Sequence, residues 1–313
     1  MPNTVRFAHI SDVHLPLEGR PPLRYMNLKR TLGWLNWQRK RRYIHTRVAL
    51  DRIVADIRSQ APDHILVSGD LINIGLPQEY EAARDWLETL GPPDRVSVVP
   101  GNHDIYTRGI EVMQGKLTWA PWIANCSYGR AIDPDTPYSL RFPFVRRVGP
   151  VAVIGVSSAV ARPVGFASGE CGKAQLDRLA AQLTRTKADG LVRLVMIHHP
   201  PLPGMAPPRR ALEDAQELAE VLGRCGAELV IHGHNHTLSS VMHGGIPVLG
   251  VASASARRSY GAEPPARYNL LTISRDAART TIDIETRGLD TPVMQIVQIA
   301  AKRFSADSAS EAP

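Results

Sequence analysis

The sequence predicts an α/β protein, because short apolar runs alternate with segments of helical periodicity. The apolar runs are bounded by Gly, Asp, Asn or Pro and predict buried strands at residues 5–10, 65–68, 96–99, 151–156, 191–197, 229–231 and 248–251. The periodic segments predict helices at residues 48–58, 79–90, 173–183 and 211–222, the last closed by Gly223. Two later apolar runs, at residues 268–273 and 280–284, have no helix between them and predict antiparallel strands late in the sheet.

The length of 313 residues allows one large domain or two ordinary ones, and either leaves room for a substantial core. The composition is 43% hydrophobic and 21% charged, with scattered Gly and Pro, which excludes collagen-like, low-complexity and wholly disordered proteins. We expect one domain over residues 1–304, with a basic helical insert at about 20–47. The small polar residues 305–313 predict a flexible tail.

The formal charge of +7 originates in one segment of the chain. Residues 20–47 contain nine Lys and Arg residues and no acidic residue, so the rest of the chain carries a formal charge of −2. Since a nucleic-acid-binding fold needs a more continuous basic surface, this distribution argues against nucleic acid as a partner.

The cysteines and the lengths of the apolar runs indicate the cellular compartment of the protein. Cys126, Cys171 and Cys225 are odd in number and widely spaced, which predicts neither a disulfide framework nor a cysteine zinc site. The chain enters an alternating pattern at Val5 without a signal peptide, and it lacks an apolar run of about 18 residues. We expect a cytoplasmic protein, for which the basic insert leaves open a peripheral association with the inner membrane.

Polar residues that can bind metal ions follow five of the predicted strands. They stand in the segments Ser11-Asp12-Val13-His14, Gly69-Asp70, Pro100-Gly101-Asn102-His103-Asp104, His198-His199-Pro200-Pro201 and His232-Gly233-His234-Asn235-His236. Loops at strand ends are where α/β proteins place their functional sites. We therefore expect the five segments to converge on one site.

The side chains of these segments suit a pair of metal ions. Two carboxylates, one carboxamide and four imidazoles supply mixed oxygen and nitrogen ligands, which favour Mn, Fe, Zn, Co or Ni. Two divalent ions and two carboxylates leave a positive surplus that attracts a phosphate ester. Ions about 3.5 to 4 Å apart can share a hydroxide and direct it in line at phosphorus. The residues therefore predict hydrolytic chemistry on a phosphate ester.

Taken in order, the motifs resemble those of the calcineurin-like metallophosphoesterases. The matching motifs are Asp12-x-His14, Gly69-Asp70, Gly101-Asn102-His103-Asp104, His198-His199-Pro200 and Gly233-His234-Asn235-His236. Any one of them can occur by accident, whereas five in order, each at a strand end, are very hard to obtain by chance. The resemblance implies a four-layer α/β/β/α sandwich of two mixed sheets and a metal-dependent phosphoric ester hydrolase.

The resemblance also implies a role for each matched residue. It assigns the first metal to Asp12, His14, Asp70 and His236, and the second to Asp70, Asn102, His198 and His234, with Asp70 as the bridge. His198 is the ligand rather than His199 because the family ligand falls two residues before a proline, here Pro200. His103 matches the family histidine that contacts the phosphoryl oxygen and leaving group, as a general acid or a charge stabiliser.

One position departs from part of the superfamily. Phosphoprotein phosphatases carry a second Asp three residues after the bridging one, and here that position is Asn73. A neutral Asn73 is expected to orient His103 without raising its pKa. The Arg-Gly that follows in those enzymes is also absent, so the pattern favours phosphodiesterases of the class III cyclic-nucleotide and glycerophosphodiester type.

Other polar residues near the motifs have supporting roles to fill. His199 is expected to touch the substrate or to support its neighbour, and Asp104 to tie down its loop by accepting backbone hydrogen bonds. The remaining histidines divide into two groups: packed or hydrogen-bonded rings at His9 and His232, and surface or loop residues at His45, His64 and His243.

The basic insert bears apolar residues on two sides. Leu28, Leu32 and Leu35 share one helical face, while Trp34 and Trp37 emerge on the opposite flank. One side is expected to pack on the enzyme, and the other can meet a substrate tail, a second subunit or an anionic membrane surface. The simpler alternative is a solvated, charged cap over the site with its tryptophans packed down.

Four hypotheses for function follow. The first is a phosphodiesterase for a small diester, with the insert as a lid and residues 202–210 as a further pocket wall. The second is a membrane-surface hydrolase that resembles the UDP-diacylglucosamine hydrolases of lipid A synthesis. A nuclease is disfavoured by the localised charge, and a non-catalytic binding protein by the complete ligand set. Residues 291–304 are apolar enough to allow a homodimer.

Overall fold

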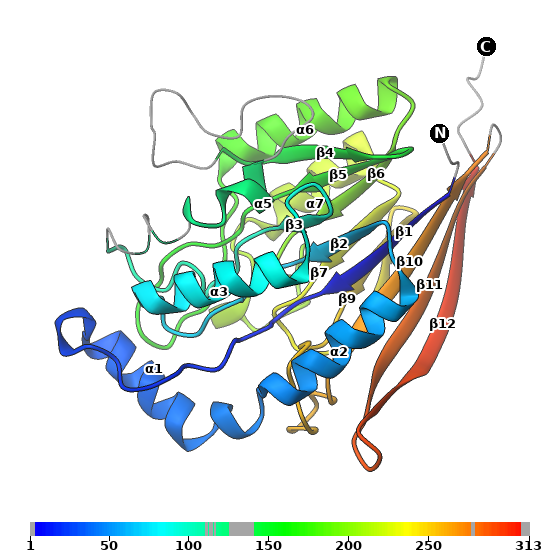
Figure 1. Cartoon of the computed structure of the whole chain (residues 1–313). Coiled ribbons are helices and arrows are strands. Elements are labelled where there is room, and N and C mark those ends of the chain that lie inside the picture. Colours follow the sequence, from blue (N-terminus) through cyan, green and yellow to red (C-terminus); the bar gives the residue numbers. More distant parts are fainter. Residues whose placement is uncertain are drawn as a thin grey trace.

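The computed structural model describes residues 4–109, 112, 115, 117–124, 141–276 and 279–307 (Figure 1). Cys126 and the end of the expected tail, residues 308–313, lie outside the described residues. The described strands form two six-stranded mixed sheets. The mixed α/β class and the two mixed sheets agree with the sequence-based expectation.

The first sheet has the strand order β12-β11-β10-β1-β2-β3. Its strands are β1 (Thr4–Ile10), β2 (His64–Val67), β3 (Val96–Val98), β10 (Arg267–Arg275), β11 (Arg279–Asp290) and β12 (Gln295–Asp307). β1, β2 and β3 are parallel, whereas β10, β11 and β12 are added as an antiparallel extension beside β1. In Figure 1 these last three strands sweep along one side of the molecule.

The second sheet has the strand order β4-β5-β6-β7-β9-β8. Its strands are β4 (Phe144–Val148), β5 (Val151–Gly155), β6 (Val192–Met196), β7 (Leu229–His232), β8 (Ser239–His243) and β9 (Ile246–Gly250). The four central strands are parallel and the two edge strands are antiparallel to their neighbours. In both sheets the carboxyl ends of parallel strands therefore meet at one edge.

The two sheets pack face to face between two pairs of helices. The α-helices are α1 (Leu28–Arg39), α2 (Arg47–Gln60), α3 (Pro77–Leu90), α5 (Ala120–Ala124), α6 (Lys173–Ala188) and α7 (Ala215–Cys225). Strand β5 divides the core by alternation, because Val151 and Val153 belong to the cluster shared with the first sheet while Ala152 and Ile154 belong to the α6 and α7 cluster. With α2 and α3 on the opposite side, the layers are α/β/β/α (Figure 1).

Helix α3 illustrates how local sequence fixes a loop of the site. Pro77 occupies its first turn, where a missing N–H costs nothing, and Glu79 accepts the backbone N–H of Leu76 at 2.9 Å. The same carboxylate accepts the backbone N–H of Asn73 at 2.8 Å. The start of α3 thus anchors the loop that follows β2.

The basic segment contains α1 between two short 3₁₀ helices, η1 (Leu23–Tyr25) and η2 (Arg41–Tyr43). Asn27 caps α1 by accepting the backbone N–H of Arg30 at 2.9 Å. Trp37 is buried and packs with Leu17, Ile74 and Leu76 on the enzyme body. On the outer side, Leu28 is exposed, so the helix packs through one flank.

All seven strands predicted from apolar runs are present within a few residues of their expected bounds, and the two late strands are antiparallel. The predicted helix at 211–222 needs correction, because α7 begins only at Ala215. Before it, residues 167–169 pair with residues 209–212, and Asp214 accepts the backbone N–H groups of Cys171 and Gly172. Gly223 lies inside the helix, which ends at Gly226 with φ 74°.

Three strands were not predicted: β4, β8 and β12. β4 carries two consecutive arginines, β8 is mostly exposed and β12 lacks a clean alternation, so none gives the signal of a buried strand. The expected tail at 305–313 is also wrong at its start, because β12 pairs with β11 as far as Asp307. Within the described residues, no helix is long and apolar enough to cross a membrane.

Candidate metal centre

The five motif loops converge at the carboxyl ends of β1, β2, β3, β6 and β7. Within them, five of the predicted ligands have left-handed backbone conformations: Asp12 (φ 53°), His14 (φ 41°), Asp70 (φ 56°), His234 (φ 69°) and His236 (φ 54°). Residues other than Gly rarely adopt this backbone conformation, and each instance costs of order 1 kcal/mol or more of folding free energy. The concentration of this backbone strain marks the loops as a functional site.

The first group of predicted ligands contains Asp12, His14 and His236. Their ligand atoms lie within 4.8 Å of one another. Asp12 Oδ1 lies 3.1 Å from His236 Nε2, and His14 Nε2 lies 4.0 Å from the same oxygen. Asp12 and His14 are fully buried, so these atoms form a compact donor set in a water-poor environment.

The second group of predicted ligands surrounds His198. Its Nε2 lies 3.5 Å from Asp70 Oδ2, 3.3 Å from Asn102 Oδ1 and 3.3 Å from His234 Nδ1. Asp70 Oδ2 also lies 3.7 Å from His14 Nε2, so this carboxylate stands between the two groups. The structure therefore brings all seven predicted ligands together, with Asp70 where a bridge is expected.

The donor set fits a pair of divalent cations. Asp12 Oδ1 is buried and receives no hydrogen bond, and two imidazole nitrogens, those of His198 and His234, face each other at 3.3 Å. A cation can take ligands from such a buried oxygen and from both of these rings. Although burial opposes it, Asp70 raises the pKa of His198 to about 9, and Asp12 likewise raises the pKa of His236 to about 9. The site therefore attracts positive charge.

Three of the rings that face the centre are oriented by a bond on their other side. His14 Nδ1 donates to the Ile72 carbonyl at 3.1 Å, and His198 Nδ1 donates to the Ser68 carbonyl at 2.7 Å. His236 Nδ1 lies 3.1 Å from Glu263 Oε2. A carbonyl or carboxylate holds the proton on Nδ1, which leaves Nε2 as a lone-pair donor for a metal ion.

His103 stands at the mouth of the centre. Its backbone N–H donates to Asp70 Oδ1 at 2.8 Å, and its Nδ1 donates to the carbonyl of Asn73 at 2.5 Å. The Asn73 side chain does not orient His103 as expected, because its Nδ2 donates to the Leu15 carbonyl at 2.7 Å. Burial, together with the Arg41 guanidinium, lowers the pKa of His103 to about 4.

Asp104 ties down its loop as expected. Its carboxylate accepts backbone N–H groups from four residues of two loops: Asp70, Leu71, Ile72 and Gly101. The His199 ring is held in place, since Ser158 Oγ lies 2.8 Å from its Nδ1 and the Ala167 carbonyl lies 3.0 Å from its Nε2. Both ring nitrogens of His199 are therefore taken by the protein.

Three site residues were missed from the sequence. Arg41, from the basic segment, reaches His14 Nε2 at 2.6 Å and His103 Nε2 at 2.9 Å. Glu263 bonds His236, and His45 lies against His14 with ring centroids 4.7 Å apart. The arginine-rich sequence indicated a basic segment near the site, but it did not single out Arg41 among the nine basic residues. No pattern near Glu263 distinguishes it from a loop acid.

The expectation that His45 and His64 are ordinary surface or loop residues is wrong. His45 is buried and lies 3.0 Å from Ser255 Oγ through Nδ1. His64 is buried at the start of β2 and bonds Ser97 Oγ through Nε2 at 2.8 Å. His9 and His232 are buried and hydrogen-bonded, as predicted.

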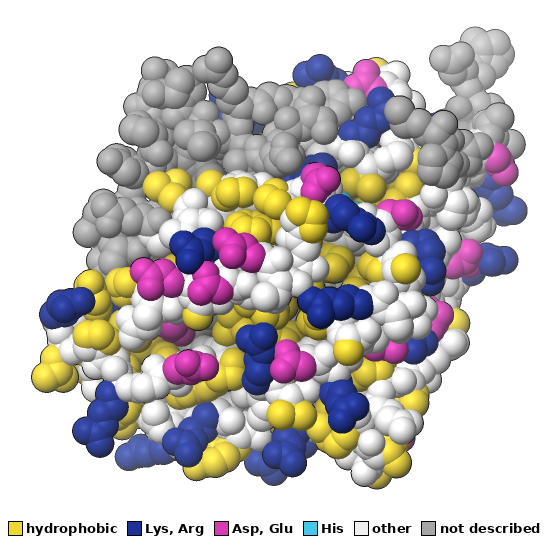
Figure 2. Space-filling model, in the orientation of Figure 1, with side chains coloured by type: hydrophobic (Ala, Val, Ile, Leu, Met, Phe, Trp, Pro, Cys, Tyr) yellow, Lys and Arg dark blue, Asp and Glu magenta, His cyan; other side chains and the backbone are white. Residues whose placement is uncertain are grey.

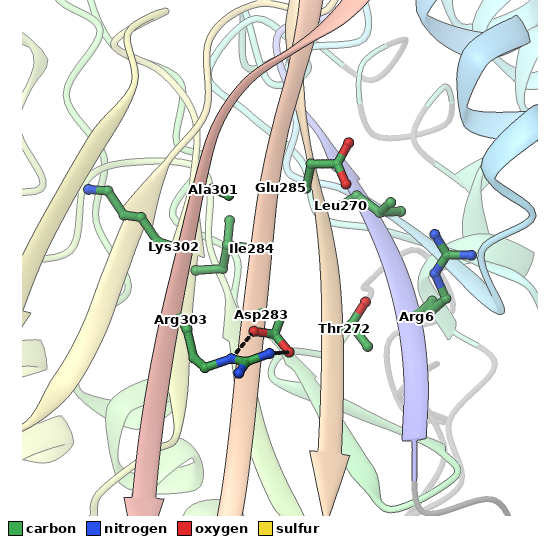
Figure 3. A pocket seen from close by; sticks show the side chains of 9 residues that line it. All are labelled: Arg6, Leu270, Thr272, Asp283, Ile284, Glu285, Ala301, Lys302 and Arg303. Carbon is green, nitrogen blue, oxygen red and sulfur yellow. Dashed lines mark hydrogen bonds and ion pairs between the residues drawn. The ribbon is translucent and has the colours of Figure 1, made fainter.

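The metal centre opens into a cavity of about 200 Å³ lined by Asp70, Asn102, His103, His234 and His236. A larger hollow of about 470 Å³ lies elsewhere, on the open face of β1, β10, β11 and β12 (Figure 3). There the Arg303 guanidinium already pairs with Asp283 across neighbouring strands, and no histidine lines the hollow. Of these two cavities, the smaller one combines predicted metal ligands with buried charge.

Comparison with known proteins agrees with this geometry. The family model of the calcineurin-like phosphoesterases matches residues 5–238. A probable cyclic nucleotide phosphodiesterase of Synechococcus sp. is 27% identical over 278 residues, which cover 88% of this chain and 90% of the relative. A glycerophosphodiester phosphodiesterase, GpdQ, of Enterobacter lignolyticus is 30% identical over 200 residues, which cover 60% of this chain and 63% of the relative.

Among solved structures, a dimetal phosphatase of Danio rerio aligns with a TM-score of 0.61 at 15% identity, covering 94% of this chain and 98% of that one. This likeness concerns the fold. The chain belongs to the calcineurin-like phosphoesterase family, because the family model spans most of its length. It is a metal-dependent phosphoric ester hydrolase with a binuclear divalent metal centre.

Proposed function

We propose that the protein hydrolyses small phosphodiesters, as do the relatives named for cyclic nucleotides and glycerophosphodiesters. The observation that carries the proposal is the position of Asp70, whose Oδ2 lies 3.7 Å from His14 Nε2 and 3.5 Å from His198 Nε2. A carboxylate between two histidine groups suits two adjacent cations. When bound, these ions would supply an activated water nucleophile and the charge that neutralises phosphoryl oxygens.

The chain's own residues would divide the remaining work. The first ion would be held by Asp12, His14, Asp70 and His236, and the second by Asp70, Asn102, His198 and His234. Their identity among Mn, Fe, Zn, Co and Ni depends on availability as much as on these ligands. Asp104 and Glu263 would keep the ligand loops and the His236 ring in place.

His103 and Arg41 would act on the substrate. Both face the rim of the centre, and the Arg41 guanidinium lies within hydrogen-bond distance of His103 Nε2. A guanidinium cannot share His14 Nε2 with a metal ion, so Arg41 would turn its donors to the phosphoryl oxygens. His103 would act as a general acid or stabilise the charge on the leaving group.

The test is reconstitution with Mn²⁺ and turnover of bis(p-nitrophenyl) phosphate against p-nitrophenyl phosphate. We expect preference for the diester, reversible inactivation by a chelator, and loss of both metal ions and turnover in Asp70→Ala. Asp283→Ala, which removes the exposed carboxylate paired with Arg303, is the matched control and should change neither. Activity that survives exhaustive chelation would refute the proposal.

A membrane-surface hydrolase is the second candidate, favoured by the outer side of the basic segment. Leu23 is 89% exposed and Leu28 is 72% exposed, close in the chain to Arg24 and Lys29. Near α1, Figure 2 shows Lys and Arg side chains spaced among hydrophobic ones. On the same face Lys and Arg also alternate with Asp and Glu, which suits a nucleic acid track poorly.

Vesicle binding separates the two candidates. If the protein acts at a lipid surface, it should sediment with phosphatidylglycerol vesicles, and a Leu23→Asn, Leu28→Asn double variant should lose this binding while it still hydrolyses bis(p-nitrophenyl) phosphate. Wild-type protein that stays in the supernatant would support the hydrolysis of small diesters.

A homodimer is a further proposal, supported by the exposed edge strand β12, and sedimentation velocity would test it.

A further inference from the structure

The metal-centre cavity continues into a second cavity of about 300 Å³, which we call the side cavity. Both cavities are lined by Asn36, Asn102, His103, Ala167 and Arg210. The side cavity extends from this shared boundary between helix α1 and the loop at residues 160–167. A group attached to phosphorus at the metal centre can therefore enter it past His103.

Large apolar side chains line the side cavity from two sides. Leu32 of α1 is 44% exposed, and Val164 and Phe166 of the facing loop are 45% and 46% exposed. Tyr106 also lines the cavity, and its ring is stacked near His103 with centroids 5.6 Å apart and an interplanar angle of 22°. Large side chains left exposed in a concave site indicate a ligand surface.

Cations accompany the aromatic side chains of this cavity. Lys29 Nζ lies 4.2 Å from the centre of the Tyr106 ring and donates to two backbone carbonyls. The Arg209 guanidinium lies 5.5 Å from the centre of the Phe166 ring. Arg210 stands at the shared boundary and forms no ion pair within the described part of the chain. Interleaved rings and cations suit the face of an added aromatic ring.

We propose that the side cavity binds the alcohol part of the ester, and that this part is an aryl or heteroaromatic group. The inference rests on the proposed phosphodiesterase function and specifies its substrate class. A cavity of about 150 Å³ can hold benzene, so the side cavity has room for a larger aromatic group. Glycerol would leave its apolar walls exposed to water, and an acyl chain would gain nothing from the cations.

Binding of phosphonates to the Mn²⁺-loaded protein tests the inference without turnover, since their phosphorus–carbon bond is not hydrolysed. We expect isothermal titration calorimetry to give a Kd for phenylphosphonate roughly tenfold lower than for methylphosphonate. Phe166→Ala and Leu32→Ala lie on opposite walls. Each should weaken the binding of phenylphosphonate about three- to tenfold and leave the Kd for methylphosphonate unchanged. Met242→Ala, which removes another exposed side chain on β8, should change neither.

The possible failures can be told apart. Equal affinity for the two phosphonates would overturn the side-cavity assignment while leaving the phosphoesterase function intact. Octylphosphonate binding more tightly than phenylphosphonate, and weakened by the same two substitutions, would overturn the aromatic assignment in favour of an acyl chain. Failure to bind methylphosphonate, together with no hydrolysis of bis(p-nitrophenyl) phosphate, would refute the proposed function itself.

Discussion

The histidines of the cleft and the histidines behind it are buried to a similar degree but are bonded differently. His14 and His198 each bond a backbone carbonyl through Nδ1, and their Nε2 atoms face the carboxylate of Asp70. His9 and His64 instead direct Nε2 to the hydroxyl of a serine. A carbonyl fixes the tautomer and leaves one nitrogen for a metal, whereas a hydroxyl can donate or accept. In these four rings the bonded partner, rather than burial, therefore distinguishes the predicted ligands from the supporting rings.

The neighbouring pair His198 and His199 offers the strongest test of this distinction. His198→Ala should lose a metal ion and reduce kcat by at least about 10³, because it removes a donor beside Asp70. His199→Ala removes a ring whose two nitrogens are already bonded to Ser158 and Ala167. His199→Ala should retain both ions, and its kcat should fall by about 10- to 100-fold at most. Metal content by mass spectrometry and steady-state kinetics measure the difference, and equal metal loss in the two variants would break the comparison.

His103 has the cleft type of bonding but is not a predicted ligand. We expect His103→Ala to keep both metal ions and to lose about 10²- to 10⁴-fold in kcat. A loss that grows with the pKa of the leaving alcohol would identify proton donation, and a uniform loss would identify charge stabilisation. Reduced metal content in this variant would place His103 among the ligands instead.

Arg41 extends the comparison to the basic segment. We expect Arg41→Gln to retain its metal ions and to lose about 10- to 100-fold in kcat/KM, in line with the loss of charge-assisted hydrogen bonds. Arg42→Gln is the control, because the neighbouring guanidinium is exposed and bonds Gln38 instead of the centre. Equal effects of the two substitutions would show that Arg41 contributes only general charge.

Residues at strand ends could be predicted from the sequence, whereas residues from irregular segments could not. The predicted ligands could be expected to meet because each follows an apolar strand, and parallel strands bring their carboxyl ends to one edge. Arg41, His45 and Glu263 could not be located, since they reach the centre from irregular segments that meet only in three dimensions. His45 pairs with Ala256 and thereby joins two such segments. The sequence also could not show which nitrogen of each histidine ring is free to bind a metal ion. That depends on a carbonyl or hydroxyl group far away in the chain.

The supporting type of histidine should be visible in the pH dependence of stability. Burial, and secondarily Arg146, lowers the pKa of His64 to about 3. The unfolded chain takes up a proton near pH 6.5 that the folded chain rejects, so the free energy of unfolding falls as the pH drops from about 6.5 toward 3.

His64→Gln can keep a bond to Ser97 but cannot titrate, so it should remove about 1 to 3 kcal/mol of this fall between pH 6.5 and 4.5. Urea titrations with a chelator present measure it free of metal binding. Gln216→Ala, which removes an exposed side chain that cannot titrate, is the control that should leave the slope unchanged. An unaltered slope in His64→Gln would mean that this ring is protonated within the fold, and then a bond to serine would not mark a histidine as neutral support.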